Sequence, residues 1–128
     1  MDTGQADRLI LCVEDHQGFA DLIRDSLSEF KVKFASNYDD AIRLLEAHRF
    51  SLILLDHSLA GDKTGFDVCR YIRERGIRTP VFMITLAKQI THDDVRDVGG
   101  DGLIRKDVDF IPVLKTITRT MVGHDDER

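Results

Sequence analysis

Short apolar runs that recur along the chain constrain its fold more than any other feature of the sequence. The runs at 9–13 and 52–55 are apolar at every position, as in a strand that is covered on both faces. This pattern favours a parallel sheet packed between two layers of helices, because solvent-facing strands alternate between apolar and polar residues. We predict five strands, at Leu9–Val13, Val32–Ala35, Leu52–Leu55, Val81–Thr85 and, most weakly, Leu103–Ile104.

Apolar residues between these runs repeat at helical spacing and predict amphipathic helices. The stripes are Phe19, Leu22, Ile23, Leu27 and Phe30; Ala41, Leu44 and Leu45; Phe66, Cys69 and Ile72; Phe110, Leu114, Ile117 and Met121. A further helix at about 91–98 has only Val95 and Val98 as apolar anchors. Strand and helix alternate five times, and right-handed crossovers fold such a pattern into a doubly wound (βα)5 three-layer α/β sandwich.

Local signals mark where three of these helices begin or end. Asn37 is suited to cap the second helix, and Thr91 with Asp94 matches a capping box. Gly76, followed by Pro80, predicts the end of the third helix.

Composition limits the classes of function. A chain of 128 residues with 42% hydrophobic residues has the material for one domain with a full core. The net charge of -5 argues against direct nucleic-acid binding and against an anionic membrane surface, so proteins are the expected partners. We predict a cytoplasmic protein with reduced core cysteines at Cys12 and Cys69, because neither a signal peptide, a membrane span nor a spaced cysteine framework is present.

Polar residues gather where the predicted strands end. Glu14 and Asp15 follow the first strand, Asp56 closes the third, Thr85 closes the fourth and Lys106 follows the fifth. In doubly wound folds this edge of the sheet holds the ligand site. Two carboxylates about 4 Å apart repel by about 4 kcal/mol at an effective dielectric near 20, so a cation is needed there. Mg²⁺ is the natural candidate because it binds carboxylates, phosphate oxygens and water together.

Four segments carry a resemblance to a known family: LILCVED, LILLDHSL, VFMIT and GGDGLIRK. Together they resemble the receiver domain of two-component response regulators, over roughly residues 8–122. The resemblance implies a flavodoxin-like fold with a parallel sheet of order 2-1-3-4-5. We expect disordered tails at 1–8 and 123–128, and a receiver domain at 9–122.

The resemblance also implies a phosphoacceptor and a metal site. Asp56 would take a phosphoryl group from a histidine kinase or a phosphotransfer protein. Mg²⁺ would be held by Asp15, by Asp56 and by the backbone carbonyl of Ser58, with Glu14 acting through a metal-bound water. Such a domain is not an enzyme with an external substrate, since it catalyses only its own phosphorylation and dephosphorylation.

The remaining implied roles concern the signal. Thr85 and Lys106 would each contact a phosphoryl oxygen, and both residues would report its charge. The switch would act on a downstream output domain or protein through the face of the fourth predicted helix, fifth strand and fifth helix. That face is also the expected surface for a possible homodimer.

The chain departs from the family pattern at several positions beside the site. The loop at 60–65 is one residue longer than expected, and Leu86 stands where a small residue usually lines access to the aspartate. Leu103 replaces a common aromatic residue. Asp107 replaces the usual proline after the lysine, which predicts a trans or visibly strained peptide bond.

Three alternatives remain open at this point. An interaction module that works without phosphorylation would keep the same acids as relics. A haloacid-dehalogenase-type hydrolase also uses an aspartyl phosphate, but its DxD motif is missing from the first strand. His16 and His57 each follow an acid of the proposed site and leave a transition-metal site to be considered.

Overall fold

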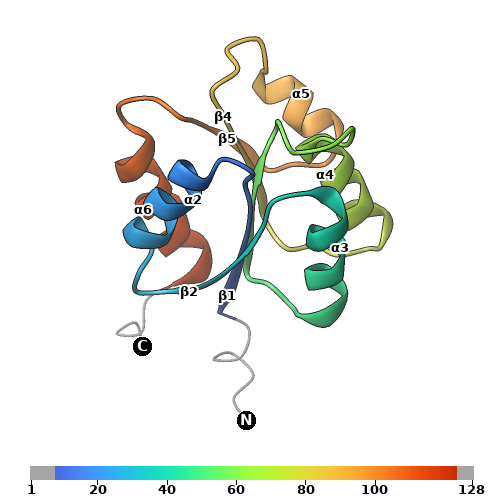
Figure 1. Ribbon diagram of the computed structural model, residues 1–128, viewed down its shortest axis with the longest axis horizontal. Helices are drawn as coiled ribbons and strands as arrows, with labels where there is room; N and C mark the ends of the chain where they lie inside the picture. Colours follow the sequence, from blue (N-terminus) through green and yellow to red (C-terminus); the bar gives the residue numbers. More distant parts are fainter. Residues whose placement is uncertain (1–7, 124–128) are drawn as a thin grey trace.

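The computed structural model describes residues 8–123 and contains one parallel sheet (Figure 1). Its strands follow the order β2-β1-β3-β4-β5, which confirms the predicted topology. The bounds of all five predicted strands agree with the observed ones to within one residue at each end. The bounds are β1 Leu9–Val13, β2 Lys31–Ala35, β3 Leu52–Asp56, β4 Val81–Thr85 and β5 Gly102–Arg105.

Helices cover both faces of the sheet, which gives the three layers seen in Figure 1. On one face lie α2 (Gln17–Ser26) and α6 (Phe110–Val122). The other face carries α3 (Tyr38–Ala47), α4 (Gly65–Glu74) and α5 (His92–Asp97). The flavodoxin-like sandwich expected from the sequence is therefore confirmed.

The alternation of side chains along β1 explains why this strand is apolar throughout. Ile10 and Cys12 pack toward α2 and α6, whereas Leu11 and Val13 pack toward α3 and α4. All four side chains are fully buried. Both cysteines, Cys12 and Cys69, are free and buried as predicted, and burial raises the pKa of each thiol.

The edge strand β2 shows the alternation that a half-covered strand should have. Val32 and Phe34 pack against the core on the α2 side of the sheet. Lys31 and Lys33 alternate with these residues and are exposed. The strand therefore contributes one apolar face and one charged face.

Two helix ends differ from the sequence expectation. Leu27 is buried but only caps α2, and Phe30 lies beyond the helix in a turn that its N–H closes on the Leu27 carbonyl. A three-residue spacing continues through this turn, so periodicity alone extended the helix too far. In α6, Met121 was predicted to belong to the apolar stripe, but it is exposed. The neighbouring Val122 is the buried residue.

The predicted caps are confirmed. The side chain of Asn37 accepts a hydrogen bond from the Asp40 N–H at 2.9 Å, and Thr91 and Asp94 form the capping box of α5. Gly76 follows α4 with a φ of 76°, a left-handed conformation that suits glycine.

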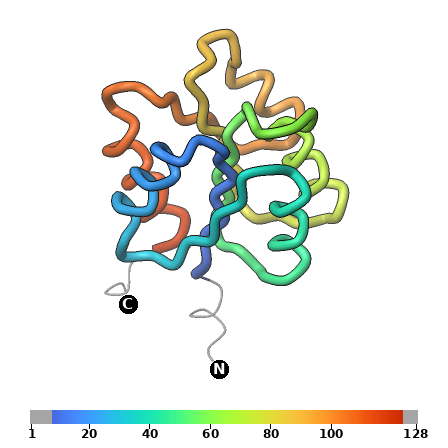
Figure 2. The backbone as a smooth tube through the Cα atoms, viewed as in Figure 1, coloured from blue at the N-terminus to red at the C-terminus, as the bar shows by residue number. Residues whose placement is uncertain are grey.

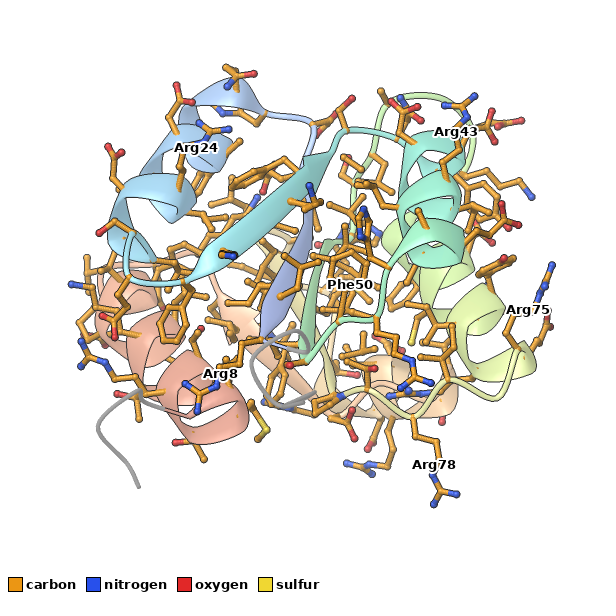
Figure 3. The ribbon with its side chains drawn as sticks, turned by 90° about the horizontal axis from the view of Figure 1, so that it is seen from below. Arg8, Arg24, Arg43, Phe50, Arg75 and Arg78 are labelled. Atoms are coloured by element: carbon orange, nitrogen blue, oxygen red, sulfur yellow. The ribbon has the colours of Figure 1, made fainter. Side chains whose placement is uncertain are left out.

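Arg73 ties together the segments at the amino-terminal end of the sheet. Its guanidinium donates to the carbonyls of Gly99, Ile77 and Thr79 at 2.8–2.9 Å and to Asp101 Oδ2 at 2.9 Å. Figure 3 looks onto this end, where Arg8, Phe50 and Arg78 are labelled.

Two further predictions from the sequence concern the ends of the chain and the peptide bond after Lys106. The tails expected at 1–8 and 123–128 lie outside the described residues, apart from Arg8 and Gly123. No peptide bond within the described residues is cis, so the bond between Lys106 and Asp107 is trans. Within residues 8–123, none of the helices has the length and apolar character to cross a membrane.

Candidate functional site

The parallel register brings the polar residues predicted from the sequence to one end of the sheet. Val13 of β1 lies beside Leu55, so Glu14 and Asp15 emerge next to Asp56 at the end of β3. On the other side, Thr85 ends β4 level with Arg105 of β5. Figure 2 shows the loops that follow β1, β3, β4 and β5 together in the upper half of the molecule.

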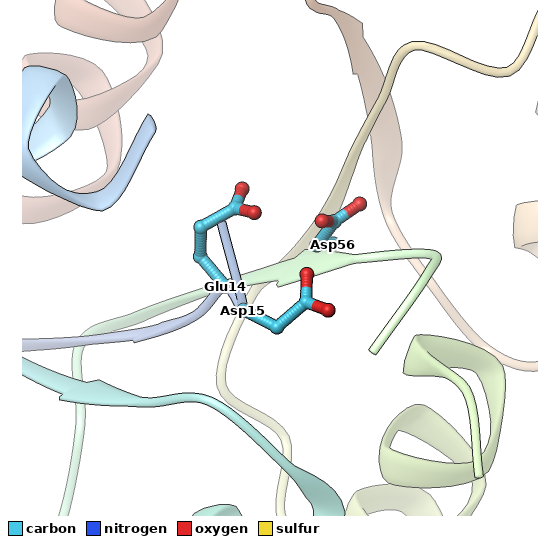
Figure 4. Close-up of side chains that lie close together, drawn as sticks. All are labelled: Glu14, Asp15 and Asp56. Carbon is cyan, nitrogen blue, oxygen red and sulfur yellow. The ribbon is translucent and has the colours of Figure 1, made fainter. Parts of the chain in front are cut away.

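Three carboxylates converge at this end. Glu14, Asp15 and Asp56 each offer an oxygen, and these oxygens lie within 4.8 Å of one another (Figure 4). Glu14 is 3% exposed and Asp56 is 6% exposed, whereas Asp15 is open to solvent. Such a set of oxygen donors with one open side suits a hard divalent cation that keeps several waters.

Lys106 supplies the positive charge inside this group. Its Nζ lies 2.7 Å from Glu14 Oε1 and 3.3 Å from Asp56 Oδ2, and its side chain is 3% exposed. The ammonium also lies 4.3 Å from the centre of the Phe19 ring, which packs edge-on against Phe110. The lysine is therefore held by two acids and by an aromatic face that links α2 to α6.

The electrostatics of the site are most visible at Glu14. Burial and the adjacent Asp56 carboxyl raise the pKa of Glu14 from 4.5 to about 7, against the opposing effect of Lys106. Oε2 of the same carboxyl accepts a hydrogen bond from the His16 N–H at 3.1 Å. One ammonium thus does not fully compensate the acids, and a second cation would favour their ionised form.

Backbone groups orient Asp56 and Thr85. Asp56 Oδ1 accepts from the Ser58 N–H at 3.3 Å. The buried Thr85 accepts from the Ala87 N–H through its Oγ1 at 2.9 Å. Because a hydroxyl has one hydrogen and this contact uses the oxygen as acceptor, the hydrogen of Thr85 stays available for a ligand.

A cavity of about 520 Å³ opens above these groups. Leu86 stands at its rim with 66% of its surface exposed. The site residues that line the cavity are Asp15, Asp56, Ser58, Thr85 and Lys106.

Both histidines next to the acids also line this cavity, but they have structural contacts. His16 Nδ1 accepts from the Phe19 N–H at 3.2 Å and so caps α2. The His57 ring packs edge-on against Phe66 at 5.4 Å. Neither histidine belongs to the group of described residues with metal-ligand spacing, so the acids are the better metal site.

Sequence reasoning missed two residues that shape the site. Gly65 begins α4 so close to β3 that a Cβ on it would lie 2.2 Å from the Asp56 carbonyl oxygen. Arg105 donates to the carbonyls of Ala87 and Ile90 at 2.8 and 2.6 Å. The sequence signal that could have pointed to Arg105 is its charge at the end of a strand, next to Lys106.

A second cavity, of about 480 Å³, lies near the start of β3. Its lining includes Phe50, Ile77 and Arg78 and contains no carboxylate. The acidic cavity at the other end of the sheet is therefore the candidate for phosphoryl and metal chemistry.

Comparison with known proteins places these features in a family. The model of the response regulator receiver domain matches residues 10–118.

Two curated relatives are transcriptional regulators from streptococci. The regulatory protein DltR of Streptococcus agalactiae is 32% identical over 112 residues, which cover 84% of this chain and 49% of that protein. The regulatory protein CiaR of Streptococcus pneumoniae is 35% identical over 100 residues, or 76% of this chain and 44% of that protein. The chain spans about half the length of the curated relatives it matches.

Solved structures share the same fold. The receiver domain of the sensor histidine kinase PA1611 from Pseudomonas aeruginosa matches with a TM-score of 0.78 and 27% identity, over 93% of this chain and 100% of that one. That structure has a magnesium ion coordinated in its active-site cleft. The chemotaxis protein CheY4 of Vibrio cholerae matches in fold with a TM-score of 0.78 and 24% identity, over 89% of this chain and 98% of that one.

Proposed function

Because this chain belongs to the response regulator receiver domain family, we propose that Asp56 accepts a phosphoryl group from the phosphohistidine of a histidine kinase or phosphotransfer protein. One observation carries the proposal. The nearly buried carboxylate of Asp56 lies beside two further acids and the ammonium of Lys106, at the floor of an open cavity. Phosphoryl transfer needs this kind of positioning and charge compensation more than it needs a proton-transferring group.

The transfer itself is a single displacement at phosphorus. A carboxylate oxygen of Asp56 forms the new bond to phosphorus while the bond from phosphorus to the imidazole nitrogen breaks, and this nitrogen keeps the electron pair. Lys106 lies 3.3 Å from Asp56 Oδ2, within reach of an oxygen on an incoming phosphoryl group. Thr85 directs its free hydroxyl hydrogen to another such oxygen.

A divalent cation fits the acids of this site. Asp15, Asp56 and the Ser58 carbonyl would hold Mg²⁺ directly, with Glu14 contributing through a bound water. The ion supplies positive charge that offsets both the carboxylates and the phosphoryl oxygens. The chemistry of the donor set supports Mg²⁺, because carboxylate and carbonyl oxygens are the ligands that this ion prefers.

The signal would pass to a protein partner. The charge change at Asp56 would alter contacts of Thr85 and Lys106, and through them the face formed by α5, β5 and α6. A downstream output domain or protein is the expected reader of this face, and a homodimer through it is a further expectation. The alternative of an interaction module that works without phosphorylation is not favoured.

Intact mass measurement after incubation with acetyl phosphate and Mg²⁺ tests the proposal. The wild type should gain the mass of one phosphoryl group, and Asp56→Asn should gain none. Asp62→Asn is the matched control, since Asp62 is an exposed acid of the adjacent loop. Chelation of the metal should abolish the gain. A wild type without any mass gain, or an Asp56→Asn variant that is labelled like the wild type, would contradict the assignment.

A further inference from the structure

Residues 86–91 form the loop between β4 and α5, which Figure 2 shows at the top of the molecule. This loop forms one wall of the acceptor cavity. Leu86, Ala87 and Gln89 all line the cavity from this loop. Its far end is anchored because Ile90 is buried in the same core cluster as Val95 of α5. The middle of the loop is more exposed and needs another attachment to keep the wall in place.

Arg105 provides that attachment from the neighbouring strand. Two of its guanidinium nitrogens bind two different carbonyls of the loop: Nη1 donates to Ala87 at 2.8 Å and Nη2 donates to Ile90 at 2.6 Å. The Ile90 N–H also closes a turn onto the Ala87 carbonyl at 3.3 Å. The planar fork of arginine therefore holds a short turn at both of its ends, through charge-assisted hydrogen bonds.

Ala87 connects this clamp to the site itself. Its carbonyl is held by Arg105, and its N–H donates to Thr85 Oγ1 at 2.9 Å. The N–H thereby fixes which side of the Thr85 hydroxyl acts as acceptor and which way its hydrogen can point. Leu86 lies between Thr85 and Ala87 in the chain and is largely exposed. The position of its backbone is therefore set by these two neighbours.

We propose that Arg105 is a positioning residue for phosphoryl transfer, which acts by holding the 86–91 loop so that Thr85 is oriented toward the acceptor cavity. This inference rests on the proposed phosphorylation of Asp56. The guanidinium of Arg105 hydrogen-bonds to the backbone of the loop, whereas the adjacent Lys106 reaches the acids from the other side of the strand. Neighbouring residues at the end of β5 thus serve the wall and the floor of the same cavity.

Labelling kinetics with acetyl phosphate and Mg²⁺ test the proposal in the full chain. Arg105→Gln should lower the labelling rate at saturating donor by about tenfold, less than the 10²–10³-fold typical of deleting a transition-state donor. The half-saturating donor concentration and the Mg²⁺ affinity should stay within about twofold, because the acids are untouched. Arg96→Gln is the matched control: it removes the same charge from nearby α5, where Arg96 pairs with Asp93 in solvent.

A double-mutant cycle distinguishes a positioning role of Arg105 from a general loss of structure in the variant. If Arg105 works through Thr85, then Arg105→Gln should have no further effect on the rate in a Thr85→Ala background. Amide hydrogen exchange of residues 86–90 should accelerate in Arg105→Gln and not in Arg96→Gln. If the effects of the two substitutions on the rate multiply, or if Arg105→Gln is labelled at the wild-type rate, the role of Arg105 is overturned. Labelling of the wild type would still support the proposed function in either case. A wild type that is never labelled would overturn the proposed function, and this inference with it.

Discussion

The buried ammonium of Lys106 makes its shorter ion pair with Glu14, at 2.7 Å. The distance to the proposed acceptor Asp56 is longer, at 3.3 Å. Before any phosphoryl group arrives, the lysine is thus chiefly the partner of an acid that is not phosphorylated. Asp56 is therefore close to a positive charge without forming a short ion pair with Lys106.

The raised pKa of Glu14 predicts a pH-dependent stability in the absence of divalent cations. The folded state binds the Glu14 proton more tightly than the unfolded chain, so the contribution is complete below pH 4.5 and is lost as pH rises through about 7. The loss is at most about 3.5 kcal/mol, since one pKa unit corresponds to about 1.4 kcal/mol. Urea unfolding in a chelating buffer should show the free energy of unfolding of wild type falling between about pH 5 and 8 relative to Glu14→Gln. Glu74→Gln, an exposed substitution, should keep the wild-type slope, and parallel curves for all three proteins would contradict the prediction.

Gly65→Ala tests the close approach of α4 to the acceptor strand. A Cβ at this position would lie 2.2 Å from the Asp56 carbonyl oxygen, so the helix start or the end of β3 must shift. We expect a loss of about 2 kcal/mol or more in the free energy of unfolding, together with slower labelling of Asp56. Gly61→Ala in the same loop should cost about 1 kcal/mol for its φ of 95° and should keep the labelling rate, because no heavy atom lies within 4 Å of its added Cβ. Equal labelling rates in the two variants would argue against a role for the close contact.

Leu86→Ala tests whether the rim of the cavity limits access. The exposed Leu86 side chain lines the cavity over Asp56, which is almost buried. Its truncation should speed labelling by acetyl phosphate by about twofold to tenfold, equivalent to at most about 1.4 kcal/mol on the barrier. Val108→Ala removes an apolar side chain that is even more exposed and does not line the cavity, and its rate should equal that of wild type. Unchanged kinetics in Leu86→Ala would end the occlusion hypothesis.

Arg73→Met should destabilise the fold far from the acceptor site. The substitution leaves the carbonyls of Gly99, Ile77 and Thr79 without their guanidinium donor and breaks the ion pair with Asp101. We expect a loss of about 2–4 kcal/mol in chemical denaturation. Arg75→Met, two residues further along the chain, removes an exposed arginine stacked on Tyr71 and should cost less than about 1 kcal/mol. Similar losses in both variants would show that the shared network is not what matters.

Thr118→Val should stabilise the protein. Thr118 is fully buried in α6, and its hydroxyl finds no hydrogen-bond partner among the described residues. Valine has nearly the same shape without the polar group, so thermal or urea unfolding should show a gain of about 1 kcal/mol. Thr120→Val, at an exposed site of the same helix, should change stability by no more than about 0.5 kcal/mol. A loss of stability in Thr118→Val would mean that the hydroxyl is satisfied in solution.

The sequence predicted the sheet well because burial on two faces leaves a strong signal. Strands such as Leu52–Asp56 are apolar along their length, and their order follows from the resemblance to a known family. Helix ends were less accurate, since Phe30 continues the apolar spacing in a turn that is no longer helical. Capping residues such as Asn37 were found because their side chains bond to the backbone nearby in sequence.

The residues of the candidate site that follow strand ends could be predicted from the sequence. Contacts that a long side chain makes with a distant part of the chain could not. Glu14, Asp15 and Asp56 meet because parallel strands bring their carboxyl ends together. The clamp by Arg105 was missed because its partners are backbone carbonyls 15 and 18 residues away in sequence, and any residue type there would offer the same oxygens. The chemical roles assigned to all of the site residues, Ser58 and Thr85 among them, stay predictions.

The charged face of β2 has a consequence for how copies of this chain meet at high concentration. An outer strand presents unpaired backbone groups that invite another strand to extend the sheet. At this edge a second copy would bring its own Lys31 and Lys33 ammonium groups close to those of the first. Pairing of two copies at the β2 edge is therefore opposed by like charges, which disfavours extension of the sheet from that side.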